Sequence, residues 1–180
     1  MAKAPTFSLI SILSLGICLP TNSQNTKLSN TQAERTHLHF YAHKALRGDV
    51  TAVVVAQAAT SNTYRYRFGE MTVFDDRLTE GPNLSSRVVG RAQGMYASAD
   101  ISNPAYLSVY NLVFTEWGLN GSTLSILGRY ASLSAERELP VVGGTRNFRF
   151  ARGHARIRTY LDDLETGRSV DEYDVYVMHS

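Results

Sequence analysis

Apolar and polar positions alternate with a period of two along much of the chain after residue 36. The segments His37–His43 and Tyr66–Phe74 alternate in this way, and Val50–Ala56 is rich in β-branched residues. Because successive side chains of a strand point to opposite faces, the pattern predicts β-strands. Further strands are predicted at residues 88–97, 107–116, 122–130, 148–160 and 170–178. No segment combines a sustained helical period with capping residues, so the sequence predicts an all-β protein of about eight strands.

Turn-forming residues separate the predicted strands. Gly, Pro, Asn or Asp residues cluster at 80–83, 120–121, 143–144 and 165–167, and such clusters are typical of tight turns. The pair Gly143-Gly144 lacks the lysine and the following helix of a phosphate-binding loop, so we interpret it as a hairpin turn. Short strands joined by tight turns indicate one antiparallel barrel or sandwich, and a barrel of about eight strands is wide enough to hold one small ligand.

The first 35 residues differ from the rest of the chain. Residues 1–23 hold one charge, Lys3, followed by an apolar run over 7–18 and by small or polar residues, which is the pattern of a secretory signal peptide. The run is shorter than the roughly 20 apolar residues that a membrane-spanning helix needs. Residues 24–35 are polar and are predicted to form a flexible N-terminal segment. We therefore expect residues 36–180 to form the single folded domain of a soluble, secreted protein.

Composition and charge exclude several classes of function. The 180 residues include 18 Lys and Arg against 16 Asp and Glu, and the net charge of +2 provides no strong field for nucleic acid. The single cysteine, Cys18, lies in the predicted signal peptide, so a mature chain would contain no disulfide and no cysteine nucleophile. No Gly-x-Ser-x-Gly motif marks a serine nucleophile. Two sequons, at Asn83 and Asn120, predict N-glycosylation.

Three histidines raise the question of a metal site. A strand would place His37, His39 and His43 on one face. No carboxylate or cysteine stands beside them at ligand spacing in the sequence, so we expect a solvated strand face with neither a metal nor another cofactor. Five arginines between residues 146 and 158 form a basic run that could meet an acidic polysaccharide, although a solvated strand face is the more common reason for such a run.

Eight sequence blocks resemble the plant dirigent proteins and follow one another in the family's order. The blocks are Phe40–His43, Phe74–Pro82, Val89–Tyr96, Leu112–Thr115, Asn120–Arg129, Arg137–Thr145, Phe148–Gly153 and Glu172–Val177. The resemblance implies an eight-stranded antiparallel β-barrel of the allene-oxide-cyclase-like kind. It also implies a homo-oligomer, a trimer or a dimer, that is secreted to the apoplast.

The resemblance further implies a role in phenylpropanoid chemistry. In lignan biosynthesis a laccase or peroxidase makes phenoxy radicals from a monolignol such as coniferyl alcohol. The dirigent protein, which has no oxidase activity, controls which faces couple to give an optically active lignan. Our leading hypothesis is therefore an auxiliary stereo-directing protein rather than a stand-alone enzyme, with a phenolic partner and no nucleic acid or membrane. The alternatives are stereoselective cyclisation or dehydration of a flavonoid, as in pterocarpan formation, and a non-catalytic phenolic-binding defence or cell-wall protein.

Residue by residue, the resemblance assigns four positions to the site. Arg137 matches the family's pocket arginine and Asp75 its acidic turn residue, so we expect both to act on the substrate. Tyr96 matches a pocket tyrosine, and Phe40, in the first block, is expected to line the pocket. For Arg137 and Asp75, a buried ion pair or a turn bond that supports the barrel is the alternative. For Tyr96 the alternative is core packing.

Two positions depart from the lignan-forming pattern. Members that form lignans carry one aspartate after the first block and another in the sixth strand, whereas this chain has Lys44 and Tyr130 there. A lysine or a tyrosine has an ordinary pKa of about 10 and is a poorer proton donor near neutral pH than a carboxylic acid. The two side chains are expected to bind a phenolate or a carboxylated phenol. The alternative is a scaffold that has lost the lignan-forming activity.

Overall fold

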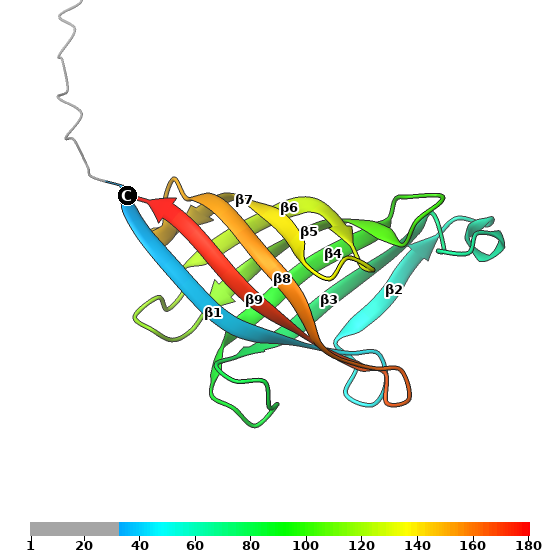
Figure 1. The fold of residues 1–180 in the computed structure, drawn as a ribbon, viewed down its shortest axis with the longest axis horizontal. Helices are drawn as coiled ribbons and strands as arrows, with labels where there is room; N and C mark the ends of the chain where they lie inside the picture. Colours follow the sequence, from blue (N-terminus) through cyan, green and yellow to red (C-terminus); the bar gives the residue numbers. More distant parts are fainter. Residues whose placement is uncertain (1–32) are drawn as a thin grey trace, which may run out of the picture. The chain divides into compact units, whose positions relative to one another are not determined.

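The structure, a computed structural model, describes residues 33–180. The predicted signal peptide and residues 24–32 of the predicted flexible segment lie outside the described residues. Within the described residues, nine strands form one antiparallel sheet in the order β1-β9-β8-β7-β6-β5-β4-β3-β2 (Figure 1). An additional pairing of β1 with β3 closes the sheet into a barrel of eight strands, and β2 extends it along β3. This closed antiparallel barrel confirms the predicted fold class.

The strands follow one another with short connections. They are β1 (Glu34–Ala45), β2 (Ala52–Gln57), β3 (Glu70–Thr79), β4 (Val88–Ser98), β5 (Ala105–Phe114), β6 (Thr123–Ala131), β7 (Arg137–Thr145), β8 (Arg152–Asp163) and β9 (Arg168–His179). Two single 3₁₀ turns are η1 (Ser61–Thr63) and η2 (Arg146–Phe148). Over residues 33–180 there is no helix long and apolar enough to cross a membrane. Strand β1 begins at Glu34, two residues before the predicted start of the domain.

Strand β7 is the element that the sequence pattern missed. The predicted turn at Gly143-Gly144 is wrong, because both glycines lie inside β7 and pair with Ser125 and Leu124 of β6. A Cβ atom on Gly144 would stand 2.7 Å from the Thr123 carbonyl oxygen. Glycine is therefore needed there for close backbone approach and not for a turn.

Alternation along each strand sends one set of side chains into the barrel. Along β3, Thr72, Phe74, Asp76 and Leu78 are buried, whereas Arg77 is exposed. At one end of the barrel these inward side chains are apolar and tightly packed, and we call this end the packed half. It contains Phe40, Leu78, Leu112, Phe114, Leu124, Leu139, Phe148, Ile157 and Val175, none of them exposed to solvent. The other end, the open half, leaves a cavity.

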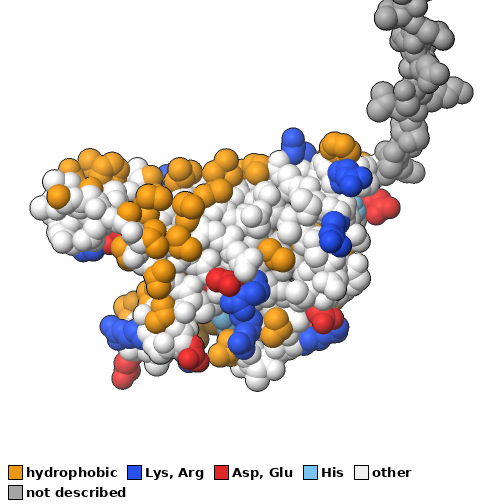
Figure 2. Space-filling view, turned by 180° about the vertical axis from the view of Figure 1, so that it is seen from behind, with side chains coloured by type: hydrophobic (Ala, Val, Ile, Leu, Met, Phe, Trp, Pro, Cys, Tyr) orange, Lys and Arg blue, Asp and Glu red, His pale blue; other side chains and the backbone are white. Residues whose placement is uncertain are grey.

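The outer surface of the barrel carries a row of exposed apolar side chains. Val53, Val73, Met95, Val109 and Leu127 are direct cross-strand partners along β2 to β6, and each is 39% to 52% exposed. Figure 2, drawn from behind, shows hydrophobic side chains gathered over part of that face. Contiguous apolar side chains in water are typical of surfaces that contact another molecule.

Candidate functional site

The open half of the barrel encloses a cavity of about 270 Å³. All eight barrel strands contribute to its wall. Its lining is unusual for a barrel interior, because tyrosines and ionisable groups replace the leucines and phenylalanines of the packed half. A concave site with a few convergent polar groups is the arrangement expected of a small-molecule site.

A hydrogen-bonded cluster around Asp171 forms one side of the cavity. Arg137, the first residue of β7, is 4% exposed and donates from Nη2 to Asp171 Oδ1 at 3.3 Å. Its Nη1 donates to Thr159 Oγ1 at 2.8 Å. The Tyr130 hydroxyl donates to Asp171 Oδ2 at 2.9 Å, and the guanidinium of Arg137 lies 4.9 Å from the centre of the Tyr130 ring. Asp171 therefore orients the two side chains toward the cavity and balances the buried arginine.

Arg137 retains one donor without a partner. Its Nε is buried and makes no hydrogen bond within residues 33–180. Buried donors in native proteins are almost always satisfied, so such an atom is typical of a site that a ligand or a water completes.

Three buried phenols of the cavity are held in the protonated state. Burial, followed by the charge of Asp171, raises the pKa of Tyr130. Burial also raises the pKa of Tyr110 and of Tyr173, whose hydroxyls lie 3.2 Å apart. Protonated hydroxyls do not act as bases near neutral pH. Tyr130 donates its one proton to Asp171. Within the Tyr110–Tyr173 pair one hydroxyl donates to the other, so among the described residues one hydroxyl of that pair is free to donate to a ligand.

The ionisable group best suited to move a proton is Asp76. Burial raises its pKa to about 6, although the Thr51 hydroxyl at 2.5 Å and the charge of Lys44 favour the carboxylate and oppose this shift. Asp76 is 5% exposed and lines the cavity. A carboxyl group that is partly protonated near pH 6 can serve as an acid in one step and as a base in the next.

The neighbouring Asp75, which the sequence assigned to the site, lies on the other face of β3. Its side chain is 49% exposed and forms an ion pair with Arg91 of β4 on the outside of the barrel. Alternation is the physical reason, because adjacent residues of a strand point to opposite faces. The period of two predicts that Asp76 points into the barrel, because it shares a strand face with the apolar residues Phe74 and Leu78.

The other predicted positions divide between the two halves of the barrel. Lys44, Tyr96 and Tyr130 line the cavity together with Arg137. The Lys44 ammonium lies 4.9 Å from the centre of the Tyr96 ring. Phe40 is fully buried in the packed half and reaches the cavity only indirectly, by stacking on Tyr173 at a ring distance of 5.2 Å.

The sequons and two of the three histidines lie on the outside of the barrel. Asn83 and Asn120 are exposed in loops, as attachment of a glycan would require, and their glycosylation stays a prediction. His43 is separated from the other two histidines, because it is buried and its Nε2 lies 2.7 Å from Thr79 Oγ1.

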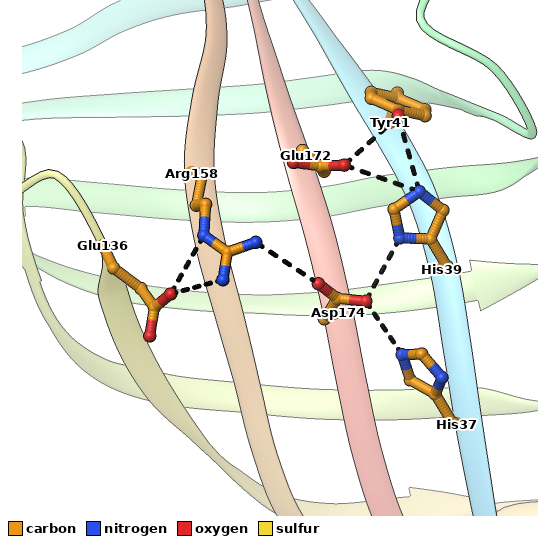
Figure 3. Close-up of polar contacts among 7 residues, drawn as sticks. All are labelled: His37, His39, Tyr41, Glu136, Arg158, Glu172 and Asp174. Atoms are coloured by element: carbon orange, nitrogen blue, oxygen red, sulfur yellow. Dashed lines mark hydrogen bonds and ion pairs between the residues drawn. The ribbon is translucent and has the colours of Figure 1, made fainter.

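His37 and His39 of β1 meet a carboxylate that the linear sequence did not reveal. Asp174 Oδ1, on β9, lies 2.8 Å from His37 Nε2 and 3.1 Å from His39 Nδ1 (Figure 3). Burial would raise the pKa of Asp174, but the hydrogen bonds with the two histidines outweigh it and lower the pKa. Among the described residues, no three His, Cys, Asp or Glu side chains are placed to hold a metal ion. Arg158 and Glu136 extend these contacts into an outer polar network.

Comparison with known proteins relates this barrel to one family. The family model described as "Dirigent-like protein" matches residues 35–178. The chain belongs to the dirigent family. This dirigent chain is 45% identical to Dirigent protein 1 of Arabidopsis thaliana over 174 residues, which cover 95% of the chain and 94% of that protein. It is 38% identical to Pterocarpan synthase 1 of Glycyrrhiza echinata, with 99% and 100% covered.

A solved structure extends the similarity to three dimensions. The pterocarpan synthase dirigent protein GePTS1 superposes with a TM-score of 0.77 and 40% identity, covering 82% of this chain and 91% of that one. This chain is thus similar both to proteins named dirigent protein and to proteins named pterocarpan synthase.

Proposed function

We propose that this dirigent protein binds a phenolic intermediate in the barrel cavity and directs its stereoselective ring closure. The first reaction to test is the dehydration of an isoflavanol to a pterocarpan. The observation that carries the proposal is the Asp76 carboxyl, with its pKa of about 6, in one cavity with the Arg137–Asp171–Tyr130 cluster. This combination supplies a proton donor and acceptor together with fixed hydrogen-bond donors in one concave site.

The size of the cavity favours a single multi-ring substrate. At about 270 Å³ it lies just below the range of about 300 to 1,000 Å³ that is usual for small-molecule pockets. One flavonoid-sized molecule suits this space better than two separate phenylpropanoid monomers. The similarity to two pterocarpan synthases, at 38% and 39% identity over 99% of the chain, supports the same substrate class.

The dehydration can be written without an oxidant. Protonated Asp76 donates its proton to the departing hydroxyl group, and the C–O bond breaks as a phenolic oxygen of the substrate supplies electrons and gives its proton to solvent water. A second phenolic hydroxyl attacks the resulting quinone methide and closes the ring, and its proton passes to the Asp76 carboxylate. The first phenolic oxygen regains its electron pair when the ring becomes aromatic again and takes a proton back from water. The net products are the ring-closed molecule and water. Arg137, whose Nε has no partner within residues 33–180, hydrogen-bonds the substrate oxygen on which charge accumulates, and Tyr130 holds Asp171 beside it.

Monolignol coupling is the second candidate, and the family assignment favours it. The closing step of that reaction also adds a hydroxyl group to a quinone methide, so the same residues serve it. It differs in its requirement for phenoxy radicals, which an external laccase or peroxidase must supply. Because two monomers must meet, a cavity of about 270 Å³ is less suited to this reaction.

Chiral chromatography separates these functions. The purified protein is incubated with a panel of isoflavanols without an oxidase, and separately with coniferyl alcohol and a laccase. An enantiomerically enriched pterocarpan supports the first candidate, and an enriched lignan supports the second. Unchanged isoflavanols together with racemic coupling products would contradict both candidate functions. The remaining hypothesis would then be a non-catalytic protein that binds phenolic compounds.

Two adjacent aspartates provide a matched pair of variants. Asp76→Asn removes the proton donor, and we expect its turnover to fall by about 100-fold or more. Asp75→Asn makes the same chemical change on the outer face and should retain activity within about twofold. Equal losses in the two variants would contradict the role of Asp76.

We also propose that the protein forms a homo-oligomer through the outer apolar row. The row spans five neighbouring strands, and each of its side chains is at least 39% exposed, which supports contact with a second copy. Light scattering after size exclusion should give a mass above that of one chain, and Met95→Lys with Val109→Lys should reduce it to one chain.

We further propose that the protein is secreted and that residues 1–23 are removed. The N-terminal sequence of the secreted protein tests both.

A further inference from the structure

A second cavity, of about 280 Å³, lies on the outer side of the barrel. It is bounded by the end of β1, the β3–β4 loop, and the strand ends of β8 and β9. It shares only Lys44 and Ser169 with the lining of the barrel cavity. We call it the outer cleft, and none of the roles proposed above uses it.

Positive charge dominates the outer cleft. Lys44, Arg77, Arg91 and Arg168 line it, and Asp49 is the one carboxylate of its lining. Arg91 is neutralised by Asp75, which lies outside the cleft. Within residues 33–180, neither Arg77 nor Arg168 forms an ion pair.

The strand register places Arg77 between two other basic residues. It stands directly opposite Arg91 on β4 and directly opposite His43 on β1. Arg91 is already paired with Asp75. Burial and the charge of Arg77 both lower the pKa of His43, so His43 is neutral near pH 7. Among the described residues, Arg77 is therefore the charge of this group that has no counter-ion, and a bound anion would supply one.

The remaining wall of the outer cleft is apolar. Leu84 of the β3–β4 loop and Leu161 of β8 are 43% and 48% exposed, and both face the cleft beside Pro82 and Val170. Arginine at an apolar wall suits a ligand that joins a flat carboxylate to a nonpolar body, because guanidinium binds carboxylate through two parallel hydrogen bonds.

We propose that the outer cleft is a second binding site, which takes a small aromatic carboxylate. Arg77 and Arg168 bind the carboxylate group, and the ring lies against Leu84 and Leu161. An acidic oligosaccharide would present hydroxyl groups to these leucines and leave them wet, so the apolar wall favours the aromatic ligand. Neither arginine lines the barrel cavity, so the proposal does not depend on the reaction proposed there.

Isothermal titration calorimetry of the full secreted protein with cinnamate tests the proposal, and cinnamyl alcohol serves as the uncharged control. We expect cinnamate to bind at least about tenfold more tightly than the alcohol. The double variant Arg77→Gln, Arg168→Gln should weaken cinnamate binding by about tenfold or more. Arg149→Gln, an exposed arginine outside both cavities, should leave it within about twofold. Unchanged affinity in the double variant would place cinnamate elsewhere and overturn the proposal.

A second pair of variants tests the apolar wall without removing an arginine. Leu161→Asp introduces a carboxylate into the outer cleft and should abolish cinnamate binding, whereas Leu164→Asp, at a position 82% exposed and outside the cleft, should not. Retained binding in Leu161→Asp, or tighter binding of galacturonate than of cinnamate, would contradict the assignment. Because these measurements record binding alone, failure of the chiral assay leaves their outcome unaffected.

Discussion

The two halves of the barrel interior are built from the same strands but differ in their inward-facing side chains. In the packed half, the rings of Phe40 and Phe148 lie 6.1 Å and 5.7 Å from the ring of Phe114, and all three are fully buried. In the open half, the same strand faces carry Asp76, Arg137 and several tyrosines around a cavity. Buried polar groups destabilise a fold unless other contacts offset them. The difference indicates that apolar burial in the packed half stabilises the barrel. This stabilisation offsets the cost of the buried polar groups in the open half.

The largest expected effect comes from a cavity made in the packed half. Phe114→Ala should lower the free energy of unfolding by about 3 to 5 kcal/mol, because it removes a ring with close neighbours on two sides. Urea denaturation measures the change. Phe150→Ala is the control, since that ring is 76% exposed, and its effect should stay within about 0.5 kcal/mol. Similar losses in the two variants would show that the packed half is not the source of stability.

The second effect has the opposite sign and lies in the open half. Asp76 has a pKa of about 6 in the fold and 3.8 ordinarily. At about pH 3 both states are mostly protonated. As the pH rises through 3.8 the unfolded state ionises while the folded state stays protonated, so stability is lost progressively until about pH 6, above which the loss is constant. Each pKa unit of difference between the two states corresponds to about 1.36 kcal/mol, so the loss in the free energy of unfolding at pH 7.5 reaches about 3 kcal/mol. Asp76→Asn should therefore be more stable than the wild type at pH 7.5, by up to that amount.

Urea denaturation at two pH values tests the prediction for Asp76. The gain in Asp76→Asn should shrink toward zero at about pH 3, where the wild-type carboxyl is mostly protonated in both states. A gain of the same size at both pH values would mean that the pKa of Asp76 is not raised.

A smaller effect is expected for the cluster around Asp171. Tyr130→Phe removes the hydroxyl that donates to Asp171 Oδ2, and the free energy of unfolding should fall by about 1 to 2 kcal/mol. The product should also lose enantiomeric excess, which chiral chromatography measures. Tyr106→Phe provides the comparison for stability, because the Tyr106 hydroxyl makes no hydrogen bond within the described residues. If the two variants were equally stable, the bond to Asp171 would not contribute.

The smallest effect is expected outside both halves, in the outer polar network. Asp174→Asn weakens the contacts with His37 and His39. The change should stay below about 1 kcal/mol, because the two histidine side chains are 48% and 40% exposed and solvent screens their contacts with the carboxylate. The lowered pKa of Asp174 means that its contribution is present above the ordinary pKa of an aspartate and disappears as the pH falls through the lower folded-state value. Thermal unfolding at low and high salt measures the difference. A loss above 2 kcal/mol, unaffected by salt, would contradict the description of this network as a surface feature.

Part of the site could be read from the sequence and part could not. Arg137, Lys44, Tyr96 and Tyr130 reach the cavity as expected from their positions in the family blocks. Asp75, which the resemblance placed in the site, lies on the outside of the barrel, and its neighbour Asp76 lines the cavity. The period of two along β3 predicts this difference, because Asp76 shares a face with Phe74 and Leu78. Nothing local marked the role of Asp171, which is brought to Arg137 only by the pairing of β7, β8 and β9.

The sequence by itself determined the all-β class, most of the strands and the family, because alternation and ordered motifs are local properties of the chain. It missed β7 because Gly143-Gly144 has the composition of a turn, whereas close backbone packing is what requires glycine there. Only the tertiary structure decided which ionisable groups share a cavity and that Arg77 stands between Arg91 and His43. The physical reason is that these neighbours lie on different strands, and their distances depend on the register in which the barrel closes.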